Sequence, residues 1–328
     1  MTGPQMVVLC CRLTRRINMM CKLLGFAVLL TITQSARGHE ENVVPGRAKT
    51  FLVGYVGHTG STAMMSVMMQ HSDLFVPSLE PLTRRQDRLE FTTTVFKNGV
   101  KAGKVTGFKI RPTDVSLRTN PEFRDLVAMH DTRYIRLTRE NIFKTAMGLY
   151  TVRALLDESA VMGLSPEELK MRCKLKPQAC YFDIKHLKFF AYLMLRYKMG
   201  SDAVSNFGAA LPWSCQLNVT YEEFVDDRDA TMRKVYSFLG VEDQILMPTF
   251  QKVVSDNPCE VISNYQVVCS KLWACDDFRP YLEDPKHNCY CVDTTSTDES
   301  LCTMKSLLAG ENDFVCQDAE GKDIACSK

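Results

Sequence analysis

The sequence predicts an α/β fold in which a mainly parallel sheet is flanked by helices, followed by a cysteine-rich tail stapled by disulfides. Three observations lead to this prediction. Short apolar segments of strand length alternate with longer segments of helical periodicity, an order that favours parallel strands joined by helices. The first strand-like segment runs into a glycine-rich turn and then a helix, which is a P-loop-like layout. Eight of the 14 cysteines fall between residues 259 and 326, a density typical of secreted domains.

The elements of the body follow one another in a regular order. Strands are expected at 50–56, 105–110, 133–137 and 217–221, and helices at 63–70, 141–156, 183–198 and 229–238. Ser165 and Pro166 open a capping box and start a further helix, and Gly240 ends the last one. The composition changes near Pro258, so we expect a leader at 1–38, a body at 49–257 and a tail at 258–328.

Composition and charge narrow the function classes. The chain of 328 residues is 45% hydrophobic and 24% charged, which excludes a disordered or collagen-like protein. A net charge of +2 is too balanced for bulk binding of nucleic acid. The net charge is +5 for residues 1–38, −7 for residues 259–328 and +4 for the residues between them. A mildly basic body favours an anionic ligand, with solvated surface charge as the alternative.

The leader resembles a signal peptide. Basic residues precede the uncharged stretch 23–35, whose apolar core LLGFAVLL is too short to cross a bilayer. Small residues allow cleavage before His39, and a start at Met19 or Met20 would give a compact leader. We therefore expect entry into the secretory pathway. A short single-pass membrane anchor and a buried helix of a cytosolic protein remain alternatives.

The cysteines point to disulfides more than to a metal. Cleavage leaves 11 cysteines, so one thiol is free or joins two chains as a disulfide-linked dimer. Cys289 and Cys291 form the only close pair in the tail, and no CxxC motif is present to begin a zinc ribbon. Motifs for metalloproteases, EF-hands, serine hydrolases and dinucleotide binding are also missing. We therefore predict no metal site.

The glycine turn after the first strand predicts an anion site. Its sequence, GHTGST at 57–62, places backbone N–H groups at the start of a helix, where they bind anions. A nucleoside triphosphate site needs GxxxxGK[ST], but Ser61 follows Gly60 where that lysine belongs. The turn therefore suits a smaller anion, such as a 5′-phosphate carrying one transferable group, and disfavours a kinase. A purely structural turn is the alternative.

Four segments in register resemble a known family. The chain is similar to sulfotransferases that use 3′-phosphoadenosine-5′-phosphosulfate (PAPS), especially the Golgi carbohydrate-type and bacterial glycolipid-type branches. The four segments are the strand, turn and helix at 51–69, LEPL at 79–82, YIRLTREN through LY at 134–150, and VTYEEF through FLG at 219–240. Together they cover roughly residues 49–245. In members of this family the turn has the sequence RSGST and the third segment has the pattern LxRENxxxxxxSLY.

The resemblance implies PAPS as co-substrate and a hydroxyl acceptor, on a carbohydrate or glycolipid. Sulfuryl transfer is an in-line displacement, so positioning and charge stabilisation carry most of the catalysis. The implied catalytic residues are Glu80, as the base that takes the acceptor proton, and His58, at the bridging oxygen. The implied cofactor-binding residues are His58, Thr59, Gly60, Ser61, Thr62, Arg139 and Thr145. Arg139 is expected at the 3′-phosphate.

Two positions depart from the family pattern. His58 stands where relatives carry Arg or Lys, and a neutral imidazole is a weaker source of positive charge. Gly148 stands where a serine is expected to contact the 3′-phosphate, and Thr145 lies one turn earlier on the same helix face. These departures keep two alternatives open: an impaired sulfotransferase-like protein that binds nucleotide or glycan, and a secreted cysteine-rich interaction protein.

Overall fold

The computed structural model describes residues 46–83, 85–117, 120–130, 132–154, 171, 174, 181–211, 215–249, 255–303, 306–307, 315–317 and 323–325. They form two compact units, each built from several chain segments. Unit 1 comprises the described parts of the chain up to residue 55, of 64–138 and of 203–247, and unit 2 those of 56–63, 139–202 and 248–328. The expected leader and the helix at Ser165 lie outside the described residues.

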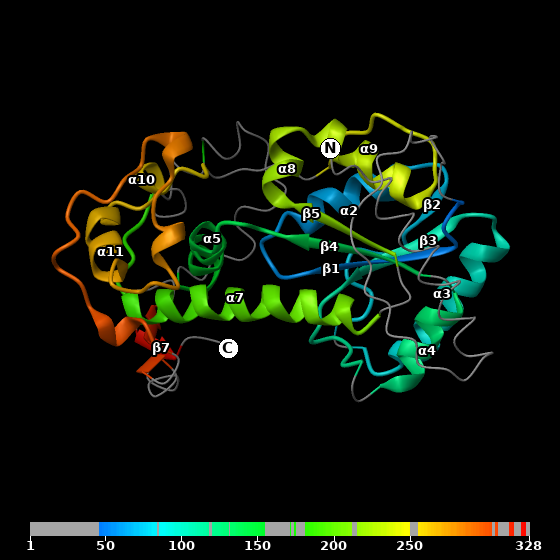
Figure 1. Cartoon of the computed structure of the whole chain (residues 1–328), viewed down its shortest axis with the longest axis horizontal. Coiled ribbons are helices and arrows are strands. Elements are labelled where there is room, and N and C mark those ends of the chain that lie inside the picture. The colour runs from blue at the N-terminus through cyan, green and yellow to red at the C-terminus, as the bar shows by residue number, and fades with distance from the viewer. Residues whose placement is uncertain are drawn as a thin grey trace, which may run out of the picture. The chain divides into compact units, whose positions relative to one another are not determined.

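Unit 1 is built on a five-stranded parallel sheet, which confirms the α/β fold (Figure 1). The strands are β1 (Thr50–Tyr55), β2 (Leu74–Phe75), β3 (Val105–Ile110), β4 (Arg133–Thr138) and β5 (Gln216–Thr220). Their order across the sheet is β2-β3-β1-β4-β5. Every residue of β1 and β3 is buried, as expected for the central strands of a covered sheet. The sequence predicts four of these strands within about a residue, and β2 is a short addition at the edge.

Helices cover both faces of this sheet. They are α2 (Ser61–Gln70), α3 (Arg88–Lys101), α4 (Pro121–Met129), α8 (Tyr221–Asp226) and α9 (Arg228–Leu239). Figure 1 shows α3 and α4 on the opposite face from α8 and α9. The helix α9 ends at Gly240 in the left-handed conformation, as predicted. The sequence analysis did not predict α3, α4 or α8.

Unit 2 places the cysteine-rich segment in one hydrophobic core with the helices α5 (Ile142–Ala154) and α7 (Leu187–Ala209). The buried ring of Phe143 on α5 packs against Phe190 on α7 and against Tyr265. Tyr265 begins α11 (Tyr265–Leu272), which follows the short helix α10 (Pro258–Val261). The described part of α7 starts later than predicted and continues eleven residues further, to Ala209. The division of the chain at 257 stays a prediction.

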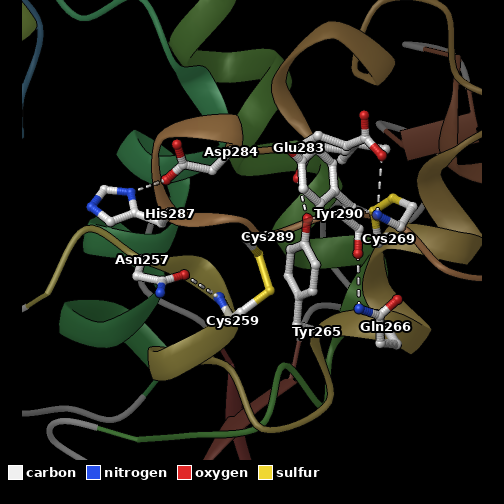
Figure 2. The surroundings of a disulfide bond; sticks show 12 residues. Asn257, Cys259, Tyr265, Gln266, Cys269, Glu283, Asp284, His287, Cys289 and Tyr290 are labelled. Atoms are coloured by element: carbon white, nitrogen blue, oxygen red, sulfur yellow. Dashed lines mark hydrogen bonds and ion pairs between the residues drawn. A yellow bond between two sulfur atoms is a disulfide. The ribbon is translucent and has the colours of Figure 1, made fainter.

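Among the described residues after Pro258, three disulfides join parts of this segment, which confirms the prediction of a stapled tail. They are Cys259–Cys289, Cys269–Cys291 and Cys275–Cys302. Figure 2 shows the first of them between Asn257 and Tyr265. Such bonds persist in oxidising compartments and are rare in the cytosol, so they are compatible with a protein of the secretory pathway. Within the described residues, no helix is long and apolar enough to span a membrane.

Candidate functional site

The glycine turn is a tight connection between β1 and α2. Tyr55 ends β1 and α2 begins at Ser61, so only five residues lie between them. His58 and Gly60 both have left-handed backbones, with φ of 62° and 71°. The buried Thr59 closes the turn, because its hydroxyl donates a hydrogen bond to the carbonyl of Val56 at 2.7 Å. The predicted strand, turn and helix are therefore confirmed as a local structure.

Arg139 lies against this turn within unit 2. It follows directly on β4, and its side chain is only 7% exposed. One guanidinium nitrogen, Nη1, donates to the carbonyl oxygen of His58 at 3.3 Å. The other, Nη2, donates to Oδ1 of Asp256 at 2.9 Å. The structure thus brings Arg139 into contact with the backbone of His58 and with Asp256, a residue that was not singled out from the sequence.

The helix α5 contributes two further positions near the turn. A Cβ atom added to Gly148 would lie 3.3 Å from Nδ1 of His58, so the imidazole covers this glycine. Thr145 is 2% exposed, and its hydroxyl donates to the carbonyl of Asn141 at 3.0 Å. That backbone bond occupies the only hydrogen that the Thr145 hydroxyl can donate.

Glu80 belongs to a second group of charged residues, in unit 1. Its Oε1 atom lies 3.0 Å from Nζ of Lys109, and its Oε2 atom accepts from Nη2 of Arg111 at 2.7 Å. The Lys109 side chain is almost fully buried, whereas that of Glu80 is 32% exposed. Nζ of Lys109 also lies 4.6 Å from the ring centroid of Tyr55. The pairing of Glu80 with Lys109 and Arg111 was not predicted from the sequence.

The electrostatics of this second group keep Glu80 ionised. Partial burial alone would raise the pKa of Glu80, but the charges of Lys109 and Arg111 outweigh it and hold the pKa below its ordinary value. Burial lowers the pKa of Lys109, which Glu80 offsets only in part. Burial, and then the charge of Glu80, raise the pKa of Tyr55. Glu80 is therefore an anion at neutral pH, flanked by two cations.

The disulfide-stapled segment contacts the start of α5 through polar groups. Nζ of Lys144 lies 2.7 Å from Oδ2 of Asp284, and both side chains are largely buried. His287 contacts the same carboxylate, as Figure 2 shows. Burial would raise the pKa of Asp284, but Lys144 and His287 hold it below its ordinary value. The amide of Asn141 also donates to the carbonyl of Tyr281 at 3.3 Å. The stapled segment therefore fixes the helix that follows Arg139.

The predicted site residues fall into these two groups. His58, Thr59, Gly60, Ser61, Thr62, Arg139 and Thr145 belong to unit 2. Glu80 belongs to unit 1, where Lys109 and Arg111 are its neighbours. The sequence contains a signal that Lys109 is paired, because a lysine inside a buried strand needs a carboxylate partner. No local pattern identifies Asp256 as the partner of Arg139, since 117 residues separate them.

No family model and no curated protein matches the chain. Solved structures that resemble it include a sulfotransferase from Alicyclobacillus acidocaldarius, with 17% identity over 72% of this chain and 93% of that one and a TM-score of 0.39. A sulfotransferase domain from the curacin biosynthetic pathway has 13% identity, coverage of 80% and 96%, and a TM-score of 0.38. A sulfotransferase domain from the olefin synthase of Synechococcus PCC 7002 has 12% identity, coverage of 83% and 98%, and a TM-score of 0.35. TM-scores below 0.5 establish no shared activity, so the functional assignment rests on the residues of this chain.

Proposed function

We propose that the protein is a sulfotransferase that moves a sulfuryl group from PAPS to a hydroxyl of a carbohydrate or glycolipid. One observation carries the proposal. The buried guanidinium of Arg139, which follows β4, donates to the backbone of the left-handed turn that follows the adjacent parallel strand β1. In the chain, β1 is followed by β2 at one edge of the sheet, and β4 is followed by β5 at the other edge. Ligands of α/β proteins bind outside the carboxyl ends of two neighbouring strands whose connections diverge in this way.

The residues of this group suit a nucleotide with two separate anionic groups. Backbone N–H groups at the start of α2 suit the 5′-phosphosulfate. They belong to Thr59, Gly60, Ser61 and Thr62, and the hydroxyls of Ser61 and Thr62 assist them. Arg139 suits the 3′-phosphate, because a guanidinium binds phosphate oxygens through two parallel hydrogen bonds. The lysine of a triphosphate site is missing at Ser61. This combination favours a 3′-phosphorylated nucleotide over ATP or GTP.

Glu80 is the proposed base. PAPS supplies a sulfuryl group attached to a phosphate oxygen, which keeps the electron pair of the broken S–O bond. Glu80 takes the proton of the acceptor hydroxyl as that oxygen forms its new bond to sulfur. Lys109 and Arg111 hold the carboxylate in place and keep it ionised before the reaction. The backbone N–H groups of the turn stabilise the charge that develops on the departing phosphate.

The proposed setting is the secretory pathway, as a Golgi-lumenal or secreted protein. Three disulfides and the signal-like sequence at 1–38 support it. The leader is proposed to be either cleaved before His39 or retained as a short anchor. A glycan hydroxyl as acceptor agrees with this compartment. The odd cysteine expected after cleavage offers a route to a disulfide-linked dimer.

A second candidate function is nucleotide binding without transfer. The observation that favours it is the pairing of both carboxylate oxygens of Glu80, one with Lys109 and one with Arg111. A carboxylate with a lowered pKa is a weaker base, so proton transfer from an acceptor has less driving force. Binding of adenosine 3′,5′-bisphosphate (PAP) without sulfate incorporation into any acceptor would favour this candidate.

The test of the proposed function is transfer of ³⁵S from labelled PAPS to a panel of glycans and glycolipids. We expect incorporation by the disulfide-bonded wild type and its loss in Glu80→Gln and Arg139→Gln. Glu90→Gln, on the exposed face of α3, is the matched control and should behave as the wild type. Equal incorporation by all four proteins would refute the assignment of Glu80 and Arg139.

A further inference from the structure

The conformation of His58 is unusual and calls for a reason. Its φ of 62° places a side chain with a Cβ atom in the left-handed region, which glycine adopts far more readily. The neighbouring Gly57 could adopt a left-handed backbone without strain, yet the left-handed conformation falls on His58. Strained residues of this kind persist at sites where the side chain is needed in one position.

Gly148 shows the matching feature on the facing helix. Glycine in the interior of a helix is unfavourable relative to alanine, yet it stands in the middle of α5. A Cβ atom at this position would lie 3.3 Å from Nδ1 of His58, which is tighter than ordinary contact, and 3.7 Å from its Cγ. The imidazole also meets the ring of Tyr197 edge-on, with centroids 6.4 Å apart. The missing side chain of Gly148 therefore makes room for the imidazole.

The backbone of His58 contacts Arg139. The guanidinium of Arg139 donates to the backbone carbonyl of His58, so the two residues contact each other directly. A neutral imidazole donates one N–H hydrogen bond, as a serine hydroxyl donates one O–H. Thr145, the other donor near Gly148, uses its hydroxyl on the carbonyl of Asn141. Of these two side chains, the His58 imidazole is the one that the structure shows against position 148.

We propose that His58 and Gly148 are a matched pair, in which the imidazole takes the place of a hydroxyl at position 148. Together with Arg139 it binds the 3′-phosphate of the nucleotide. This inference rests on the proposed function and refines it, because it moves His58 from the bridging oxygen to the 3′-phosphate and replaces Thr145 there. The two departures from the family pattern then compensate for each other.

The test compares the affinities for PAP and for AMP, which lacks the 3′-phosphate, by isothermal titration of the disulfide-bonded protein. His58→Gly removes the imidazole and keeps a backbone that accepts the left-handed conformation, so it should fold with an unchanged melting temperature. We expect PAP to bind about tenfold more weakly, as for a lost hydrogen bond to a charged group, and AMP to bind as before. His58→Asn keeps an N–H donor and tolerates the backbone, so it should retain part of the preference for PAP.

A second set of variants changes position 148. Gly148→Ser alone should weaken PAP binding severalfold, because the new side chain displaces the imidazole. In His58→Gly/Gly148→Ser the serine hydroxyl fills the vacated place, and the preference for PAP should return to within about threefold of the wild type, a non-additive result. An unchanged PAP/AMP ratio in His58→Gly would overturn this inference alone. A wild type without any preference for PAP would overturn the proposed function together with it.

Discussion

The two charged groups of the molecule are built in opposite ways. In unit 1 one carboxylate, Glu80, is held by two cations and stays one-third exposed. In unit 2 one cation, Arg139, is held by one carboxylate, Asp256, and is almost fully buried. The first arrangement keeps an excess positive charge beside a carboxylate that is fixed in place. The second neutralises a cation that an anionic ligand would need.

This difference separates the two proposed roles. Glu80 is already ionised and held in position by Lys109 and Arg111 before any ligand binds. Arg139 must exchange the carboxylate of Asp256 for a phosphate, so nucleotide binding has to compete with an existing buried ion pair. Variants of the first group are therefore expected to change the rate of transfer, and variants of the second to change the affinity for nucleotide.

The largest effect is expected from Glu80→Gln. The amide cannot take a proton, so the rate of sulfuryl transfer should fall by about 10³-fold, while the affinity for PAP stays within about twofold. Single-turnover transfer with ³⁵S-labelled PAPS, together with titration of PAP, measures both quantities. A parallel loss of rate and PAP affinity would place Glu80 in the nucleotide site and break the comparison.

Arg139→Gln is expected to weaken PAP binding by about 100-fold, because it removes a charge-assisted bidentate contact. The variant also removes the cation that is paired with Asp256, so Arg139→Gln/Asp256→Asn serves as the version in which the carboxylate charge is removed as well. Arg233→Gln, at an exposed ion pair with Asp243, is the matched control. Affinity for PAP that survives in the double variant would contradict the proposed role of Arg139.

Asp256→Asn should have a smaller effect, and in the opposite direction. Arg139 would lose its competing carboxylate, so PAP should bind about tenfold more tightly. The free protein should melt at a lower temperature, since a buried cation has lost its partner, and saturating PAP should raise the midpoint more than in the wild type. Weaker PAP binding in this variant would show that Asp256 supports the site and does not compete for it.

The smallest effect is a shift in a pH profile. Because the pKa of Glu80 is lowered, its protonation should reduce transfer only below the ordinary value of 4.5. Lys109→Met removes one of the two cations and keeps the burial, so the pKa of Glu80 should rise and the acidic limb of kcat/KM should move to higher pH. Lys101→Met, at an exposed residue of α3, is the control and should leave the limb in place.

The same shift has a consequence for stability. A carboxylate whose pKa is lowered by folding stabilises the folded state at pH values above its unfolded pKa, and this contribution is lost as the pH falls through the folded pKa. Glu80 and Asp284 both belong to this class. Lys109→Met should therefore reduce the contribution of Glu80, with Arg111 still in place, and make the unfolding free energy, measured by denaturant titration at several pH values, less dependent on pH in the acidic range.

Much of unit 1 could be predicted from the sequence, because its signals are local. The strand β1 contains the apolar run FLVGY, β3 carries Val105, Phe108 and Ile110, and Gly240 is a helix end that needs no tertiary context. The helix α3 was missed because its sequence, RLEFTTTVFKNGVK, contains three consecutive threonines and no side-chain cap. The helix α8 was missed although Thr220 and Glu223 form a capping box that the sequence contains.

The candidate site was only partly predictable, for a physical reason. The glycine turn and Arg139 stand at strand ends, and local sequence identifies such positions. Their partners do not follow from local sequence. Asp256 and Arg139 are 117 residues apart in the chain, and Arg111 and Glu80 are 31 residues apart. The pairing of His58 with Gly148 depends on the fold of the turn against α5, so the sequence shows two departures and only the structure relates them.

A crystal structure of the disulfide-bonded protein with PAP bound tests the central claim most directly. The measured quantities are the distances from the guanidinium of Arg139 to the 3′-phosphate and to the carboxylate of Asp256. We expect 3′-phosphate oxygens within hydrogen-bond distance of Arg139 and of the His58 imidazole, with the bond to Asp256 broken. PAP bound away from the turn, or Arg139 still paired with Asp256 in the complex, would contradict it.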